Sequence, residues 1–397
     1  WYPLDINIGG HEHKRVHFPV FLYAHARLLP PELQPRGIFV HGWITGPSGA
    51  KLSKKEISSK GGRGTGGARR IPPIDQALAR WGPDALRLYY TNAAAASSEV
   101  AWSSEGVDAA LARLEDIERL LGGTRGSARG PPELDAWLLS KMHRLIARVR
   151  TGFAAADLRS VAEEVYVGVP SLLRRYHARG GEAGATTEQI GRAWVLLLAP
   201  ITPHLAEEVG AGRFPGLVAT EPFPRADEFP LSVDGEAREE YLDRVEEDLR
   251  AVLRPHQDRA APSPEEVVFF IAAAWKTTVE GWMREAVDRG ESPTLHAIME
   301  RVQRHPELTA HRAEVPKYVQ RVGLLLRAET GRSPGPVDEG ATLRAAEGYL
   351  VRRFGFRSVK VVDEAEGEAS DPRGRRERSR PGIPAFYLVG PDAAPEP

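Results

Sequence analysis

The sequence contains no cysteine and no long apolar run, and both absences limit what the chain can be. Without cysteine, disulfide bonds and cysteine-ligated zinc are excluded, and the redox compartment of the protein cannot be inferred. No apolar stretch approaches the roughly 18 residues that indicate a membrane-spanning helix, and no signal peptide is recognisable. We therefore expect a cytoplasmic protein without a membrane partner.

Net charge is also scarce, at −1 over 397 residues, but the charges are segregated along the chain. Residues 51–70 are strongly basic, with Glu56 as their single acid, whereas residues 234–247 are strongly acidic. Because a ligand responds to local charge, near-neutrality does not exclude a polyanionic partner such as RNA or a nucleotide. The length predicts about two to four domains.

The hydrophobic pattern divides the chain into an α/β segment, a helical region and a terminal α/β domain. Residues 37–43 predict a buried strand and residues 17–29 a helix, an alternation that is typical of α/β folds. Helical spacing follows from residue 74, and an acidic, proline-rich connecting helix and linker is expected before the terminal domain. The predicted regions are 1–70, 71–130, 131–225, 226–264 and 265–397.

A histidine-rich turn led by Gly10 allows three interpretations. His11, His13 and His17 could converge on a metal, but no cysteine or obvious fourth ligand is near, so we predict no bound metal. In the second interpretation, Gly10 lets a sugar approach the backbone while Glu12 and His13 hydrogen-bond its hydroxyls. In the third, these residues only cap the helix that follows them.

The predicted strand 37–43 ends in His41 and Gly42, immediately before a basic loop. Gly42 would permit the close approach of a flat base, and His41 could donate a hydrogen bond to that base or to a phosphate. Strands often end in glycine, so this pair gains its significance from its position between the histidine-rich turn and the basic loop.

The basic loop contains the run Lys51-Leu52-Ser53-Lys54-Lys55, flanked by glycines. Such a loop can close over a polyphosphate, and its ammonium groups can follow the charge that develops on a leaving group. An isolated run of this kind is more often a solvated surface loop. The motifs on both sides favour the nucleotide interpretation.

In their order along the chain, these motifs resemble the second half of the catalytic domain of class I aminoacyl-tRNA synthetases. The lysine run resembles the KMSKS signature of that family, with Leu52 replacing Met and Lys55 replacing the final Ser. An apparent insertion at 56–67 follows, and Ser58-Ser59-Lys60 within it could be the displaced tail of the signature. The matching segments are 1–5, 10–13, 17–19, 35–37, 41–43 and 51–55.

Downstream segments extend the resemblance over nearly the whole chain. Residues 81–89, 135–141 and 194–208 are similar to the helix after the signature loop and to two helices of the anticodon-binding bundle. Residues 172–176 and the C-terminal block resemble the leucyl subgroup of archaeal and eukaryotic type. The resemblance implies the end of a Rossmann-like α/β catalytic domain, a helical anticodon-binding bundle and a small α/β tRNA-binding terminal domain.

The resemblance implies ATP-dependent activation of leucine and its transfer to tRNA-Leu, with Mg²⁺ accompanying ATP. Lys54 would then stabilise the departing pyrophosphate, Lys51 would support it and Ser53 would shape the loop. The ATP-binding residues implied are Gly10, Glu12, His13, His41, Gly42 and Lys54. The tRNA-binding residues implied are Arg144, Arg148, Arg174 and Arg175. A basic run at 373–380 either joins the tRNA contact or is a disordered loop.

The N-terminal half of such an enzyme, with its H-x-G-H turn, editing domain and leucine pocket, is not recognisable in this sequence. We therefore expect a C-terminal fragment, or one subunit of a split enzyme, that is inactive without the missing N-terminal half. One alternative is a non-catalytic tRNA-binding module derived from a class I synthetase. Another is a related synthetase specific for isoleucine, valine or methionine.

Overall fold

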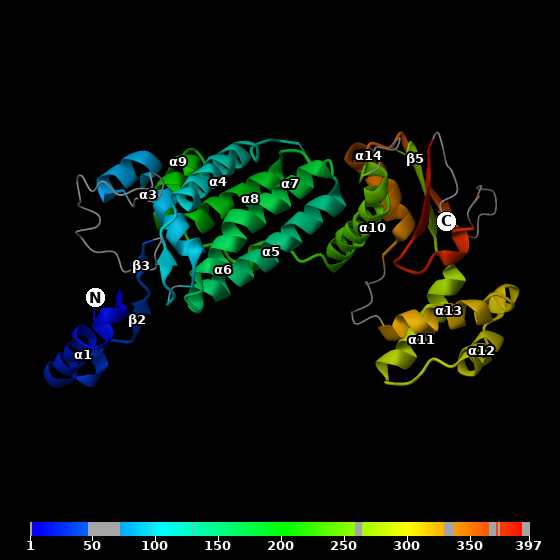
Figure 1. The fold of residues 1–397 in the computed structure, drawn as a ribbon, viewed down its shortest axis with the longest axis horizontal. Helices are drawn as coiled ribbons and strands as arrows, with labels where there is room; N and C mark the ends of the chain where they lie inside the picture. The colour runs from blue at the N-terminus through cyan, green and yellow to red at the C-terminus, as the bar shows by residue number, and fades with distance from the viewer. Residues whose placement is uncertain are drawn as a thin grey trace. The chain divides into compact units, whose positions relative to one another are not determined.

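The computed structural model describes residues 2–46, 72–95, 97–128, 130–258, 264–328, 337–364, 371 and 374–390. They divide into two compact units, Trp1–Leu231 and Ser232–Pro397, each with its own hydrophobic core (Figure 1). None of the helices in these ranges is long and apolar enough to cross a membrane.

The first unit begins with a small parallel pair of strands, β1 and β2, connected through the helix α1 (Figure 1). The helix expected at 17–29 is present as α1. The strand expected at 37–43 is present as the shorter β2, but none of its residues is buried, so the expectation of a buried strand is wrong because no second layer among the described residues covers it. A second short parallel pair joins β3 to β4, which lies after the next helix along the chain. The elements are β1 (Asn7–Gly10), η1 (His11–Lys14), α1 (His17–Leu28), η2 (Pro31–Leu33), β2 (Ile38–His41), β3 (Ile44–Thr45) and β4 (Val100–Ala101).

The rest of the first unit is a helical bundle in which α4, α5, α7 and α8 lie side by side (Figure 1). Its first helix, α3, bends at Gly82 because the Pro83 ring disfavours helical backbone at the preceding residue. A π-helical turn, η3, immediately precedes the segment containing Pro170, which has no N–H to donate. The helices are α3 (Ile74–Ala93), α4 (Ser104–Gly122), α5 (Pro132–Ala154), α6 (Leu158–Glu163), η3 (Glu164–Gly168), α7 (Val169–Ala178), α8 (Ala185–Leu198), α9 (Pro203–Gly210), η4 (Val218–Thr220) and η5 (Ala226–Glu228).

Large aromatic side chains fill the centre of this bundle and satisfy their polar atoms there. Trp194 is fully buried and donates from Nε1 to the carbonyl oxygen of Val165 at 2.9 Å. Tyr166 is also buried, and its hydroxyl lies 2.7 Å from Thr202 Oγ1. These bonds avoid the cost of burying the indole N–H of Trp194 and the hydroxyl of Tyr166 without a partner.

The second unit contains a three-stranded sheet in the order β6-β5-β7. The central strand β5 pairs in parallel with β6 and antiparallel with β7, and its middle residues are buried. This explains why β5 is a continuous apolar run rather than an alternating one. The elements are α10 (Val233–Asp258), β5 (Glu266–Ile271), α11 (Ala274–Asp288), α12 (Leu295–Gln303), η6 (Pro306–His311), α13 (Val315–Ala328), α14 (Glu339–Phe354), β6 (Ser358–Asp363), η7 (Arg376–Arg378) and β7 (Ala385–Val389).

The long helix α10 belongs to the core of the second unit. Tyr241, Leu242 and Leu249 are buried in the same cluster as residues of α14 and of the sheet. The Tyr349 hydroxyl of α14 donates to Glu246 Oε1 of α10 at 2.8 Å. Helix α10, which lies within the segment 226–264 expected as a connecting helix and linker, therefore supplies one wall of this core. A separate small core joins α11, α12 and α13.

Candidate functional site

The parallel pairing of β1 and β2 brings two predicted motifs together at one edge of the sheet. Gly10 is in register with His41, each at the carboxyl end of its strand. Ligands of open parallel α/β sheets bind beyond the carboxyl ends of the strands. The histidine-rich turn η1 begins directly after Gly10, so Glu12 and His13 lie at the same edge.

Glu12 has a defined partner at this edge. Trp43, just after β2, donates from Nε1 to Glu12 Oε2 at 2.5 Å. The same carboxylate explains the glycine before η1, since a Cβ at Gly10 would lie 2.6 Å from Glu12 Oε2. The sequence analysis included Trp43 in a motif but missed this role, which holds the Glu12 carboxylate beside the strand ends.

His13 is packed among rings rather than left free in solvent. The centroid of its imidazole lies 4.8 Å from that of the His17 ring, which it meets edge-on, and 5.8 Å from that of the Phe18 ring. A Cβ on Gly9 would lie 2.4 Å from His13 Nδ1, so the Gly9-Gly10 pair admits both site side chains against the backbone. Within the described ranges, no group of three or more His, Asp or Glu residues is placed to hold a metal ion.

His41 is exposed, and its tautomer follows from one contact. Its Nδ1 lies 2.8 Å from the carbonyl oxygen of Gly42. A carbonyl only accepts, so Nδ1 carries the proton, and Nε2 of the neutral ring is left as an acceptor. Such an acceptor can receive a hydrogen bond from an amino group.

The structure explains the glycine at position 42 by a packing contact that the sequence did not indicate. A Cβ built there would lie 2.0 Å from the carbonyl oxygen of Ser98. The adjoining backbone is bonded to the same region, because Val100 N donates to the Trp43 carbonyl at 2.9 Å. The absence of a side chain at Gly42 therefore admits the chain's own backbone, and the contact with an adenine base stays a prediction.

The signature-like lysine run lies outside the described residues. Lys51, Ser53 and Lys54 all fall between residues 46 and 72, so their predicted roles stay predictions. The described chain resumes just before α3, in the same unit as the strand pair.

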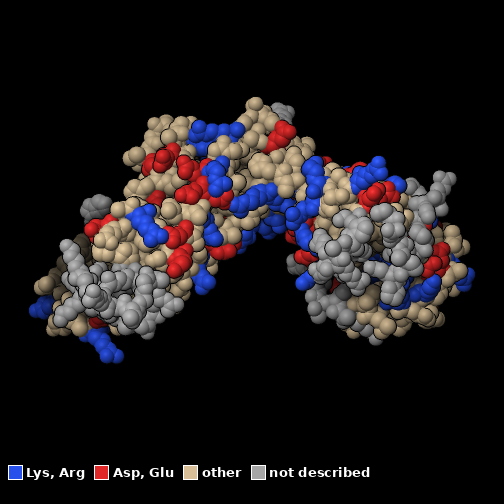
Figure 2. Space-filling view, turned by 45° about the horizontal axis from the view of Figure 1, so that its top comes forward, with Lys and Arg blue, Asp and Glu red and all other residues tan. Residues whose placement is uncertain are grey.

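The four arginines predicted to bind tRNA lie on α5 and α7 of the bundle. Arg144, Arg148 and Arg174 are exposed, and Arg175 is half-buried. Arg148 forms a two-pronged pair with Glu164, at 2.5 and 2.8 Å, and Arg174 pairs with Asp116 of α4. Figure 2 shows Lys and Arg side chains interspersed with Asp and Glu on the visible face. An RNA phosphate would have to compete with these internal carboxylates.

The basic run near the C-terminus does not act as one surface. Arg380 is buried and forms an ion pair with Glu280, with Nη2 3.0 Å from Oε1. Arg376 lies over the Phe270 ring at 5.3 Å. The expectation of a uniform tRNA contact or a disordered loop is therefore wrong for Arg380, which is part of the domain's interior.

A family model described as the anticodon-binding domain of tRNA ligase matches residues 135–268. The match runs from α5 of the first unit to β5 of the second. The segments at 135–141 and 194–208, which carried the resemblance to the anticodon-binding bundle, both fall inside it.

Archaeal proteins named leucine–tRNA ligase align with nearly the whole chain. The Methanothrix thermoacetophila protein is 29% identical over 98% of this chain and 39% of its own length. The Aeropyrum pernix protein is 32% identical over 98% of this chain and 38% of its own length. A solved LeuRS–tRNA–LeuAMS ternary complex from Agrobacterium radiobacter gives a TM-score of 0.48 and 23% identity, over 57% of this chain and 30% of that one.

The motif order and the family match define the class: this chain is similar to the tRNA ligases and contains a segment that matches their anticodon-binding domain. Within that class it is similar to the archaeal leucine–tRNA ligases, which confirms the predicted resemblance to the leucyl subgroup. A multidomain, mostly helical fold is confirmed as well. The chain spans about two fifths of the length of these relatives.

Proposed function

We propose that this chain is the part of a leucine–tRNA ligase that carries the ribose-side edge of the ATP site, the pyrophosphate loop and the tRNA-binding domains. The observation that carries the proposal is the alignment of 98% of the chain with leucine–tRNA ligases. The register of Gly10 with His41 supports it, because it brings the predicted nucleotide contacts to one sheet edge. We place this activity in the cytoplasm.

On the ATP side, the residues act by positioning. Glu12, steadied by Trp43, accepts from the ribose hydroxyls, and the Nε2 of His41 accepts from the adenine amino group. Gly10 and His13 complete the sugar side, and Gly42 lies at the adenine side. Mg²⁺ would accompany the ATP phosphates and neutralise their charge. Lys54 then stabilises the pyrophosphate as the leucine carboxylate attacks the α-phosphate, with Lys51 and Ser53 supporting the loop.

The strand pair requires a second polypeptide region to complete its core. Phe18 is the buried residue of α1, whereas Val20, Tyr23 and Leu28 on the same helix are 68%, 75% and 77% exposed. Ile8 of β1 is 65% exposed. Apolar side chains gathered in this way indicate a face that another segment covers. We infer that the part of the relatives' length not matched by this chain supplies that segment, in cis or in trans.

On the tRNA side, Arg144, Arg148, Arg174 and Arg175 contact phosphates of tRNA-Leu along α5 and α7. Binding through such contacts weakens steeply with salt, since each neutralised phosphate releases counterions. Without tRNA, Arg148 pairs with Glu164 and Arg174 pairs with Asp116. With tRNA bound, phosphate oxygens replace these carboxylates, so both guanidinium groups are paired in the free and in the bound state.

The test is leucine-dependent pyrophosphate exchange by this chain combined with the missing N-terminal half. Lys54→Ala should abolish the exchange because the leaving group loses its cation. Lys60→Ala in the second serine–lysine run is the comparison variant, and it should retain activity. Activity that persists in Lys54→Ala would refute the role assigned to Lys54.

The same experiment separates the non-catalytic alternative. A complemented chain that binds tRNA-Leu in a salt-dependent manner, yet shows no exchange with any amino acid, would be a binding module only. Exchange that depends on isoleucine, valine or methionine in place of leucine would contradict the leucine assignment.

A further inference from the structure

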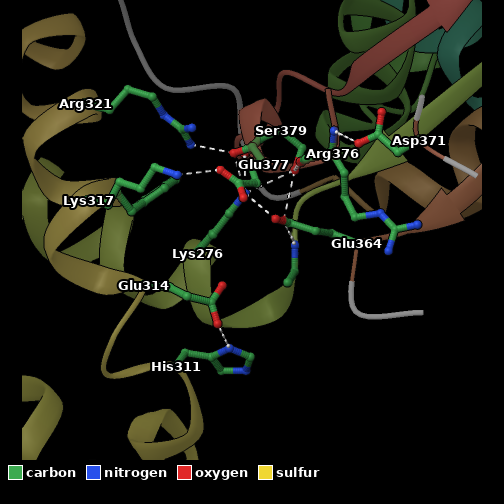
Figure 3. A network of polar contacts seen from close by, with 12 residues as sticks. Lys276, His311, Glu314, Lys317, Arg321, Glu364, Asp371, Arg376, Glu377 and Ser379 are labelled. Carbon is green, nitrogen blue, oxygen red and sulfur yellow. Dashed lines mark hydrogen bonds and ion pairs between the residues drawn. The ribbon is translucent and has the colours of Figure 1, made fainter. Parts of the chain in front are cut away.

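The second unit contains a hollow of about 170 Å³ between α11, α13 and the segment around η7, which we call the α13 pocket. Lys276 of α11 and Lys317 and Arg321 of α13 supply its positive charges, and Trp275 and Tyr318 form an aromatic wall. Figure 3 shows the three cations directed toward the η7 segment, where Glu377 lies between them. The three cations are not among the residues predicted to bind ATP or tRNA, although the terminal domain as a whole was expected to bind tRNA.

The positive charge of Lys276 at the base of the pocket is neutralised by a carboxylate of the same unit. Lys276 is almost fully buried, and its Nζ lies 2.6 Å from Glu364 Oε1 and 3.1 Å from the Ser379 carbonyl oxygen. Glu364 is held in turn by Ser379, whose hydroxyl donates to Oε2 at 3.0 Å. Burial lowers the pKa of Lys276, and the adjacent carboxylate opposes that change. This pair is a fixed part of the fold.

The rim of the pocket is different because its charges are exposed. Lys317 Nζ lies 2.8 Å from Glu377 Oε2, and these side chains are 75% and 69% exposed. Arg321 Nη2 donates to the Glu377 carbonyl oxygen at 2.6 Å. An exposed ion pair of this kind changes an equilibrium by no more than about five-fold, so an external anion can replace the carboxylate.

Two cations of α13 lie next to each other at the rim. Lys317 and Arg321 are four residues apart and therefore occupy one face of the helix, where like charges repel. The hydrogen bond from Lys317 and the positive charges of Lys317, Arg321 and Lys276 hold the pKa of Glu377 below its usual range. Glu377 contacts both rim cations, Lys317 through its carboxylate and Arg321 through its backbone carbonyl oxygen. Glu314 also lines the pocket and lies 3.2 Å from His311, so the pocket gains a net positive charge only when the Glu377 carboxylate moves away.

We propose that the α13 pocket binds a phosphate group through Lys317 and Arg321, and that Glu377 is an internal competitor that occupies the site until it swings outward. Lysine supplies a point charge and arginine a planar donor fork, a combination suited to phosphate oxygens. The Arg321 guanidinium lies over the Tyr318 ring at 5.5 Å, which restricts its orientation. The phosphate is either an RNA diester or that of a free phosphate compound.

The test measures binding of radiolabelled inorganic phosphate to the full chain by equilibrium dialysis. Glu377→Gln should bind about two- to five-fold more tightly than the parent chain, since it removes the competing charge of an exposed pair. The matched control is Glu291→Gln, which alters another exposed pair of the same unit, with Arg289 at 3.4 Å, and should leave binding unchanged. Lys317→Ala and Arg321→Ala should each weaken phosphate binding in the Glu377→Gln background.

Adding tRNA identifies the source of the phosphate. If tRNA displaces bound phosphate from the parent chain, and Arg321→Ala loses this displacement, the ligand is an RNA diester. If the phosphate stays bound in the presence of tRNA, the ligand is a free phosphate compound. The absence of saturable phosphate binding by Glu377→Gln overturns the proposal. An equal gain in Glu291→Gln, or undiminished binding after both cation substitutions, also overturns it. Lys317, Glu377 and Glu291 are exposed and Arg321 is half-buried, and unchanged thermal unfolding verifies that each variant remains folded.

Discussion

Glu280 of α11 is the most consequential single charge in the second unit. Its side chain is about 1% exposed and joins three partners from different parts of the chain. Arg380 Nη2 and Arg284 Nη2 lie 3.0 and 2.7 Å from Oε1, and the Tyr318 hydroxyl donates to Oε2 at 2.6 Å. Glu280→Gln keeps the size of the side chain, removes its charge and replaces one acceptor oxygen with an NH2 donor.

The expected cost follows from the burial of the partners. Arg380 is 5% exposed, so the substitution removes the Glu280 carboxylate from a guanidinium inside the domain. Removing one member of a buried ion pair costs about 3–5 kcal/mol. Since 1.36 kcal/mol corresponds to a factor of ten, the opening equilibrium of this unit should rise more than about 100-fold.

Peptide-resolved hydrogen exchange at neutral pH measures that change in α11, α13 and residues 379–383 separately from the first unit. The matched control is Glu285→Gln on the same helix, whose partner Arg301 lies 3.0 Å away and whose side chain is 55% exposed. Exposed pairs of this kind contribute about 0–1 kcal/mol. If Glu280→Gln exchanges no faster than Glu285→Gln, the reasoning from burial is refuted.

Two further predictions concern close packing and pH. Gly42→Ala should destabilise the β3–β4 junction by about 1–3 kcal/mol, because its Cβ would lie 2.0 Å from the Ser98 carbonyl oxygen. The control is Gly216→Ala, because nothing lies within 4 Å of the Cβ added there. Equal rates of amide hydrogen exchange at Val100 in both variants would contradict the predicted clash with Ser98. Burial raises the pKa of Glu339 above its ordinary 4.5. The folded state therefore binds that proton more tightly, and stability falls as pH rises from 4.5 through the raised pKa. Glu339→Gln should flatten this part of the unfolding profile in urea titrations at several pH values, and an unchanged slope would count against it.

The elements around the nucleotide edge were predictable because local chemistry marks them. Proline follows α1 and Gly42 follows β2, so α1 and β2 lie within the expected helix and strand, whereas β1 was not expected. The in-register meeting of Gly10 and His41 also follows from a parallel pair, whose carboxyl ends share one edge. The Glu12–Trp43 bond was not predicted, because hydrophobic periodicity contains no information about a contact between side chains 31 positions apart.

The second unit was less predictable for two physical reasons. Helix α13 contains Pro316 near its start and Gly323 in its interior, two residues that indicate turns, so its apolar spacing was overlooked. The pairing of Glu280 with Arg380 joins residues 100 positions apart, and it converts part of a basic run into an interior group. Charge patterns in sequence report composition, whereas burial decides whether a charge meets solvent.

The helical bundle and the strand pair differ in how much of their apolar surface is buried, and therefore in whether each is stable by itself. This difference affects the proposed reaction. The bundle buries large aromatic residues such as Trp194, while α1 buries Phe18 and leaves most of its apolar surface exposed. A two-stranded sheet is at best marginally stable in water. The edge that holds Glu12 and His41 therefore depends on the covering segment for its stability. Since apparent affinity falls with the fraction of molecules in the competent state, the proposed ATP binding at this edge would depend on the association of the proposed covering segment, whereas the proposed tRNA contacts on α5 and α7 would not.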